Sequence, residues 1–101
     1  MKVITVCGSY KFKQEMQEIT EKLALEGNCM ITPIELTKSS KEEYTQEEAL
    51  LLGNMHKEKI RLSDAILVVN VGGYIGESTK SEIAFAKSFN KEIIYYTDLI
   101  G

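Results

Sequence analysis

Residues 64–86 read DAILVVNVGGYIGESTKSEIAFA, and this stretch decides the fold class. Its first part, 65–71, is apolar apart from Asn70, as is typical of a strand that is buried on both faces of a parallel sheet. Glycines and hydroxyl side chains follow at 72–78, and then a helical pattern that carries Glu82. Open α/β sheets bind anionic and sugar-bearing ligands where such loops meet helix N-termini. The stretch therefore predicts a strand, a loop and a helix, and with them the place of a binding site.

The same alternation extends toward the N-terminus. An apolar, β-rich run at 3–7 stops at Gly8-Ser9, and apolar residues then recur at helical spacing from about 13 to 26. Gly27-Asn28 is typical of a helix end, and a second apolar run covers 29–34. The first part of the chain is therefore predicted to be a strand, a helix and a second strand.

A longer helix is expected at 45–62, because Thr45 and Glu48 have the spacing of a capping box. The polar segment before it, 37–44, is expected to be an exposed loop or a short helical turn, and a mobile lid. Beyond the central strand, a third helix is predicted at 79–89 and a last strand at 92–96.

Alternating strands and helices require right-handed crossovers and a parallel sheet. We predict one domain, residues 1–101, with a three-layer α/β/α fold of the flavodoxin or Rossmann type and about four strands in the order 2-1-3-4. In that order the chain changes direction between the first and third strands, so the loops at 8–10 and 72–78 meet at one crevice.

The composition excludes several classes of protein. The chain has 101 residues and a formal net charge of −3, and scattered Lys and Arg give no electrostatic footprint for a nucleic acid polymer. No apolar stretch approaches the roughly 20 residues that a membrane-spanning helix needs. Met1-Lys2 leads directly into a strand and not into a signal peptide. We therefore expect a cytoplasmic protein that binds neither a membrane nor a nucleic acid polymer.

The sequence offers little from which to build a metal site. Cys7 and Cys29 lie in apolar runs without CxxC spacing, and we expect both to be buried free thiols. His56 is the only histidine and lies beside Lys57 and Lys59 on the long predicted helix, where a surface position is expected. We therefore predict neither a metal nor a cofactor.

The crevice offers carboxylate, hydroxyl and backbone amide groups. Glu82 and Glu77 supply the carboxylates, and the hydroxyls around them belong to Ser9, Tyr10, Tyr74, Ser78, Thr79 and Ser81. A carboxylate can attack an anomeric carbon while a neighbouring hydroxyl orients it, and amides at a helix start can receive a phosphate. A structural alternative stays open, because Thr79 and Glu82 also match a capping box and glycine loops are often only turns.

Four segments of the chain resemble motifs of one family. They are Val6-Cys7-Gly8-Ser9, the segment 62–69, Gly76 together with 82–86, and the segment 89–94. At these positions the chain resembles the nucleoside 2-deoxyribosyltransferase superfamily, and within it the branch of 2'-deoxynucleoside 5'-phosphate N-glycosidases. The likeness covers nearly the whole chain and implies a single domain of that kind.

The resemblance assigns Glu82 as the nucleophile that forms a glycosyl-enzyme intermediate, which water or a second base resolves. The tyrosine that holds the nucleophile in the family falls at Thr5, and either Tyr10 or Tyr74 is a candidate to replace it. An aspartate of the family falls at His56, which with Lys59 would make that wall cationic at mild acidity and suited to an anionic ligand. The resemblance also implies a homo-oligomer, most simply a dimer.

Three hypotheses follow. The first is a nucleotide N-glycosidase or deoxyribosyltransferase that acts on a small-molecule nucleotide or nucleoside. Its candidate catalytic residues are Glu82, Tyr10 and Tyr74, and its candidate substrate- or phosphate-binding residues are Gly8, Ser9, Gly73, Gly76, Glu77, Ser78, Thr79 and His56. The second is a non-catalytic module of the same fold that binds or senses a nucleotide or nucleotide-sugar, with Glu82 as a helix cap. The third is an interaction protein whose long helix pairs with a partner.

Overall fold

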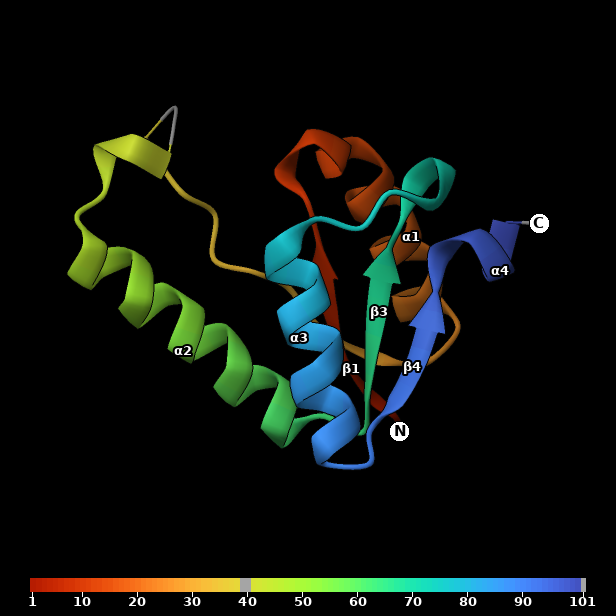
Figure 1. Ribbon diagram of the computed structural model, residues 1–101. Coiled ribbons are helices and arrows are strands. Elements are labelled where there is room, and N and C mark those ends of the chain that lie inside the picture. The colour runs from red at the N-terminus through yellow and green to blue at the C-terminus, as the bar shows by residue number, and fades with distance from the viewer. Residues whose placement is uncertain (39–40, 101) are drawn as a thin grey trace.

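A computed structural model describes residues 1–38 and 41–100 of the chain, and strands and helices alternate along it (Figure 1). The elements in chain order are β1 (Val3–Gly8), η1 (Tyr10–Phe12), α1 (Lys13–Leu25), β2 (Cys29–Ile31), η2 (Lys41–Glu43), α2 (Gln46–Leu62), β3 (Ala65–Val69), η3 (Val71–Gly73), α3 (Glu77–Ser88), β4 (Glu92–Tyr95) and α4 (Tyr96–Ile100). Within the polar segment that was expected to be a loop and a lid, η2 is a short 3-10 turn, and Ser39 and Ser40 lie outside the described residues.

The described strands form one four-stranded parallel sheet in the order β2-β1-β3-β4. The two central strands pair from Ile4 opposite Ala65 to Gly8 opposite Val69. The predicted α/β class and the strand order 2-1-3-4 are therefore confirmed.

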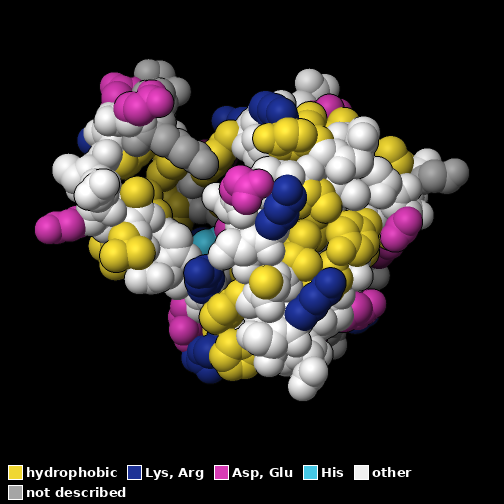
Figure 2. Space-filling model, in the orientation of Figure 1, with side chains coloured by type: hydrophobic (Ala, Val, Ile, Leu, Met, Phe, Trp, Pro, Cys, Tyr) yellow, Lys and Arg dark blue, Asp and Glu magenta, His cyan; other side chains and the backbone are white. Residues whose placement is uncertain are grey.

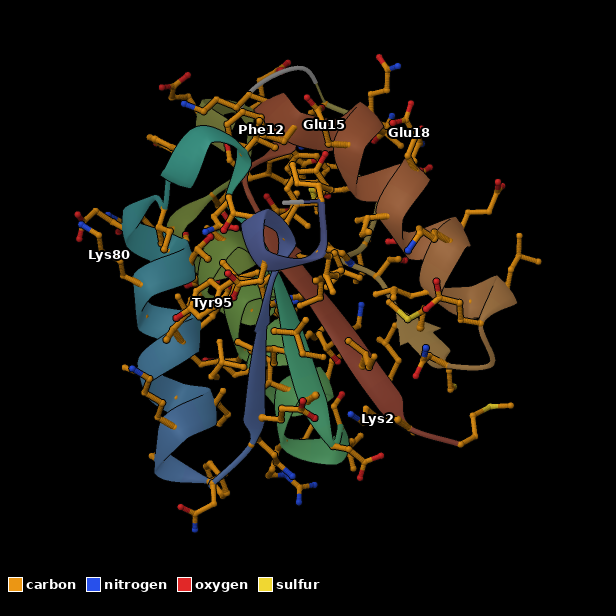
Figure 3. The ribbon with its side chains drawn as sticks, turned by 90° about the vertical axis from the view of Figure 1, so that its right-hand side faces the viewer. Lys2, Phe12, Glu15, Glu18, Lys80 and Tyr95 are labelled. Carbon is orange, nitrogen blue, oxygen red and sulfur yellow. The ribbon has the colours of Figure 1, made fainter. Side chains whose placement is uncertain are left out.

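Helices cover both faces of the sheet, with α1 on one face and α2 and α3 on the other (Figure 3). Successive side chains of a strand point to opposite faces, so Ile4 and Val6 pack in the core beneath α1. Cys7 points the other way and packs with Ile60 of α2 and Ile83 of α3. The predicted three-layer arrangement is confirmed, and it places Cys7 on the side of α2 and α3.

Gly8 ends β1 in close contact with β3. A Cβ atom at this position would lie 3.2 Å from Val69 Cβ and 3.3 Å from the Val69 carbonyl oxygen, which is tighter than ordinary contact. The close approach occurs at the carboxyl end of β1, toward the end of the molecule where Figure 3 labels Phe12, whereas Lys2 lies at the opposite end. A side chain at position 8 would therefore require Val69 or one of the two central strands to move.

The capping box that was predicted for α2 is present. The Glu48 amide donates to Thr45 Oγ1 at 3.0 Å, and the Thr45 amide donates to Glu48 Oε1 at 2.8 Å. Only the C-terminal part of α2 contributes to the core, through Ile60. The N-terminal part projects away from the sheet (Figure 1). The C-terminal end of this helix is therefore anchored to the domain, while the N-terminal part extends beyond it.

The second capping box, between Thr79 and Glu82, is not formed. The third helix begins at Glu77, two residues before the predicted start, and its N-cap is Gly76, which has no side chain to cap the helix. Thr79 therefore lies inside the first turn, and Glu82 lies in the second turn. The interpretation of Glu82 as a helix cap is wrong.

Other boundaries differ from the predictions for local reasons. β2 ends at Ile31, before Pro33, whose nitrogen cannot donate a hydrogen bond to a neighbouring strand. β3 gives way to the η3 turn after Asn70, and Tyr96 begins the short helix α4 and does not extend β4. Cys29 lies on β2, at the edge of the sheet, and is exposed, so the prediction that both thiols are buried holds only for Cys7.

Among the described helices, none combines the length and the apolar character that crossing a membrane requires.

Candidate functional site

A cleft of about 570 Å³ lies at the carboxyl ends of β1 and β3. One wall is α2, and the other consists of the loops after β1 and β3 and the start of α3. Figure 2 shows the molecule hollowed between the projecting part and the main body, with the single histidine of the chain visible in the hollow. The lining residues are Gly8, Ser9, Tyr10, Met16, Pro33, Ile34, Leu36, Tyr44, Ala49, Leu52, Gly53, Met55, His56, Lys59, Tyr74, Gly76, Glu77, Ser78, Thr79 and Glu82. The two predicted loops therefore meet at one site.

Glu82 lies on the cleft wall beside Cys7 and His56. Cys7 Sγ is 3.4 Å from His56 Nε2, and the same nitrogen is 3.8 Å from Glu82 Oε1. The His56 side chain is 12% exposed and the Glu82 side chain 18% exposed. Each residue comes from a different element: β1, α2 and α3. The crossing of these elements thus places a thiol and an imidazole next to the carboxylate.

His56 is neutral at physiological pH. Burial lowers the pKa of His56 to about 4, and the nearby Lys59 ammonium contributes to the shift. The contact between His56 and Glu82 is therefore a polar contact and not an ion pair near neutral pH. The expectation of a histidine at the helix surface is wrong, and so is that of a His56 cation at mild acidity.

The Cys7 thiol remains protonated in this environment. Burial raises the pKa of Cys7 well above its ordinary value, and the negative charge of Glu82 and a hydrogen bond with its side chain raise it further. A protonated thiol is a poor nucleophile. Cys7 is therefore suited to holding the Glu82 carboxylate and not to attacking a substrate.

Thr5, where the resemblance places the tyrosine of the family, lies away from the cleft. It is fully buried, and its hydroxyl donates to the Lys59 carbonyl at 3.1 Å and shares a short hydrogen bond with Ser63. Thr5 therefore ties β1 to the C-terminal end of α2. Cys7, two residues further along the same face of β1, is the residue beside Glu82.

The two candidate tyrosines line the cleft but make other contacts. The Tyr10 hydroxyl donates to the Ile34 carbonyl, and burial and the charge of Glu35 raise the pKa of Tyr10. The Tyr74 ring meets Phe12 edge to face at a centroid distance of 5.9 Å, and Lys11 Nζ lies 3.4 Å from its centroid. Both rings shape the mouth of the cleft.

Hydroxyl and amide groups gather where α3 begins. The first backbone hydrogen bond there runs from the Lys80 amide to the Gly76 carbonyl at 2.9 Å, so the amides of 77–79 precede the helical ladder. Ser78 and Thr79 line the cleft at this point, and Ser9 lines it from the loop after β1. This end of the cleft can receive an anion.

Glu77 and Gly73 are placed differently. The Glu77 side chain is 92% exposed and pairs with Lys80 at 3.2 Å, although the residue contributes to the cleft lining. Gly73 is not among the described residues that line the cleft. Its φ is 84° and its amide donates to the Asn70 carbonyl at 2.8 Å, which closes the turn after β3. A left-handed conformation of this kind favours glycine.

Comparison with solved structures identifies the architecture. The 2-desoxiribosyltransferase from Leishmania mexicana superposes with a TM-score of 0.66 over 95% of this chain, at 16% sequence identity. The chain has the deoxyribosyltransferase fold. It spans 64% of the length of that structure. No protein-family model matches the chain, and no curated protein matches it either.

Within this deoxyribosyltransferase fold, the sequence did not predict that Cys7 lies beside Glu82 and His56. Its position at the carboxyl end of a central strand, immediately before Gly8, was a signal, but an isolated cysteine in an apolar run is typical of a core residue. Sequence patterns also did not single out three residues that line the cleft, namely Tyr44, Leu52 and Met55. Apolar residues on a helix give no indication of whether they face a core or a ligand.

Proposed function

We propose that this chain is an N-glycosidase or deoxyribosyltransferase that cleaves the bond between base and sugar in a small-molecule nucleotide, with Glu82 as the nucleophile. One observation carries the proposal. The carboxylate of Glu82 lines a cleft at the ends of the central strands of the deoxyribosyltransferase fold, and the residue is not a helix cap.

The proposed reaction has two steps. A Glu82 oxygen bonds to the anomeric carbon while the bond from that carbon to the base nitrogen breaks, and the base leaves with the electron pair and takes up a proton from solvent. Water or a second base then attacks the same carbon, loses a proton to solvent, and releases the Glu82 carboxylate. The negative charge of the carboxylate stabilises the oxocarbenium-like transition states of both steps.

Cys7 and His56 are proposed as the positioning residues for Glu82. Cys7 is protonated and hydrogen-bonded with Glu82, and the His56 ring nitrogen lies 3.8 Å from the carboxylate. The Tyr10 hydroxyl, by contrast, donates to a backbone carbonyl. In this proposal a thiol and a neutral imidazole do what a tyrosine hydroxyl does in the family that the sequence resembles.

The anion-accepting end of the cleft favours a phosphorylated substrate over a neutral nucleoside. The cleft is lined by Ser9, Ser78 and Lys59 as well as by the first residues of α3. Their hydroxyl, ammonium and amide groups are the candidate partners for a phosphate. Lys59 Nζ donates to the Thr32 carbonyl at 3.0 Å, which holds it at the wall. A 5'-phosphate bound here would leave the sugar facing Glu82.

The test is to incubate the purified chain with nucleosides, deoxynucleosides and their 5'-monophosphates and to measure free base by chromatography. We expect base release from at least one monophosphate, and its loss in Glu82→Gln. Glu18→Gln, an exposed change on α1 outside the cleft, is the matched control and is expected to retain the activity.

Two results would contradict the proposal. Full turnover by Glu82→Gln would exclude Glu82 as the nucleophile. Saturable nucleotide binding without any released base would instead indicate the binding or sensing module.

A further inference from the structure

Cys7, His56 and Glu82 form a compact set of three different donor atoms. The sulfur, the imidazole nitrogen and a carboxylate oxygen all lie within 4.8 Å of one another. His56 Nε2 faces both partners, at 3.4 Å from Cys7 Sγ and 3.8 Å from Glu82 Oε1. The three atoms therefore surround one point between β1, α2 and α3.

These separations are close to those of a tetrahedral metal site. Zinc binds sulfur at about 2.3 Å and nitrogen or oxygen at about 2.0–2.2 Å, so that neighbouring ligand atoms are roughly 3.3–3.6 Å apart. The separation between Cys7 Sγ and His56 Nε2 already falls in this range, and that between His56 Nε2 and Glu82 Oε1 exceeds it by a few tenths of an ångström. The sulfur and the carboxylate oxygen lie within 4.8 Å of each other, so side-chain shifts that draw the three atoms together would complete the geometry.

The donor set selects for one kind of cation. Thiolate and imidazole are ligands for zinc and similar transition metals, whereas magnesium and calcium require oxygen ligands. An imidazole binds a metal through a ring nitrogen of its neutral form. Cys7 would lose its thiol proton to solvent as the sulfur–metal bond forms, which makes binding depend on pH.

The surroundings leave one coordination position accessible. Cys7 is buried, whereas His56 and Glu82 line the cleft. Catalytic zinc sites typically have three protein ligands and a fourth position that is open to water or substrate. Structural zinc sites, by contrast, use four protein ligands.

We propose that Cys7, His56 and Glu82 bind one Zn²⁺ ion at the base of the cleft. The metal would coordinate the Glu82 carboxylate, which the proposed function uses as a nucleophile. If that function holds, the zinc-bound chain is therefore inhibited. The binding itself does not depend on the glycosidase activity and is measured without it.

The experiment titrates Zn²⁺ into the full chain, freed of metal by a chelator, and follows binding by calorimetry in two buffers of different ionisation enthalpy. We expect about one Zn²⁺ per chain, with release of about one proton from Cys7. Changes to residues that only support metal ligands weaken binding by about 10–100-fold. We therefore expect Cys7→Ser, His56→Gln and Glu82→Gln each to weaken it by at least about 100-fold.

Cys29→Ser is the matched control, because Cys29 is an exposed thiol on β2 and is not in the cluster. We expect this variant to bind zinc as the unaltered chain does. Co²⁺ provides a second readout, since a thiolate-to-cobalt absorption band should be present in Cys29→Ser and absent in Cys7→Ser. Circular dichroism of each variant confirms that a lost signal is not a loss of folding.

Three results would overturn the proposal: no saturable Zn²⁺ binding to the unaltered chain, binding that persists in folded Cys7→Ser or His56→Gln, or binding that disappears in Cys29→Ser. Failure of base release in the separate nucleotide assay would leave the zinc site standing, so the two proposals can fail independently.

Discussion

At the scale of single residues, the environment of Glu82 is the most informative feature of the chain. The sequence was sufficient to single out Glu82 as a candidate, because a glutamate in the helix after a glycine loop resembles a family motif, and the structure places Glu82 at the cleft. The neighbours Cys7 and His56 were not predictable as a group, since 49 residues separate them and only the crossing of α2 over β1 brings them together. Local patterns predict periodicity and burial, but not which distant side chains meet.

If Cys7 positions Glu82, its effect on the rate depends on the hydrogen bond that its side chain donates to the carboxylate and not on the sulfur atom as such. We expect Cys7→Ala to lower kcat for base release by about 10- to 100-fold, because a misplaced nucleophile costs rate, with little change in KM. Cys7→Ser retains a donor and should recover most of the lost rate. Equal losses in both variants would indicate that the thiol only fills space.

His56 predicts a defined pH dependence of stability. Its pKa is about 4 in the folded chain, against about 6.5 when unfolded. Between about pH 6.5 and about pH 4, His56 is therefore protonated in the unfolded chain and neutral in the folded chain. The contribution to stability is full above about pH 6.5 and is lost as the pH falls toward about 4.

The measurement is chemical unfolding of the unaltered chain and of His56→Gln at about pH 7.5 and about pH 5. The unaltered chain should lose about 2 kcal/mol more of its free energy of unfolding between these values than the variant does. Cys7, Lys59 and Glu82, the groups that face His56, are present in both proteins. The same pH dependence in both would show that His56 titrates normally.

At the scale of elements, apolar runs and helical spacing predicted every strand of the sheet and its order. Two of the boundary differences are each explained by one residue, Pro33 after β2 and Gly76 before α3. The helix α4 was missed because Tyr96 continues an apolar, aromatic run that is typical of a strand. Whether such a run stays extended depends on the contacts available to it, which the sequence does not specify.

Two glycines provide a contrast between elements. Gly8→Ala should destabilise the chain by about 1–3 kcal/mol, because the new methyl group would be forced against Val69 between the two central strands. Gly53→Ala, inside α2 with open space at its Cβ position, should stabilise it by roughly 0.5–1 kcal/mol. Urea unfolding of both variants measures the difference. Stabilisation by Gly8→Ala would mean that the strands adjust without cost.

At the scale of the whole molecule, the projecting part of α2 exposes apolar side chains. Leu50 is 66% exposed and Leu51 56% exposed, and neighbouring apolar residues of this kind commonly mark a contact surface. We propose that the chain forms a homo-oligomer, most simply a dimer, through this face of α2.

Sedimentation over a range of protein concentrations tests the association. We expect a dimer that the double change Leu50→Glu and Leu51→Glu converts to a folded monomer, because charges in an apolar contact are costly. Leu25→Glu is the control, since Leu25 is 82% exposed on α1 and should leave the dimer intact. A monomer at every concentration would exclude this role for α2.

The helix that carries this apolar face is also one wall of the cleft (Figure 2). Only its C-terminal part is fixed to the sheet, so a neighbouring chain that packs on the projecting part would brace the wall from outside. The catalytic rate per chain would then depend on protein concentration. A chain in a dilute sample would turn over substrate more slowly than the same chain in a concentrated sample, although the residues of its site are the same.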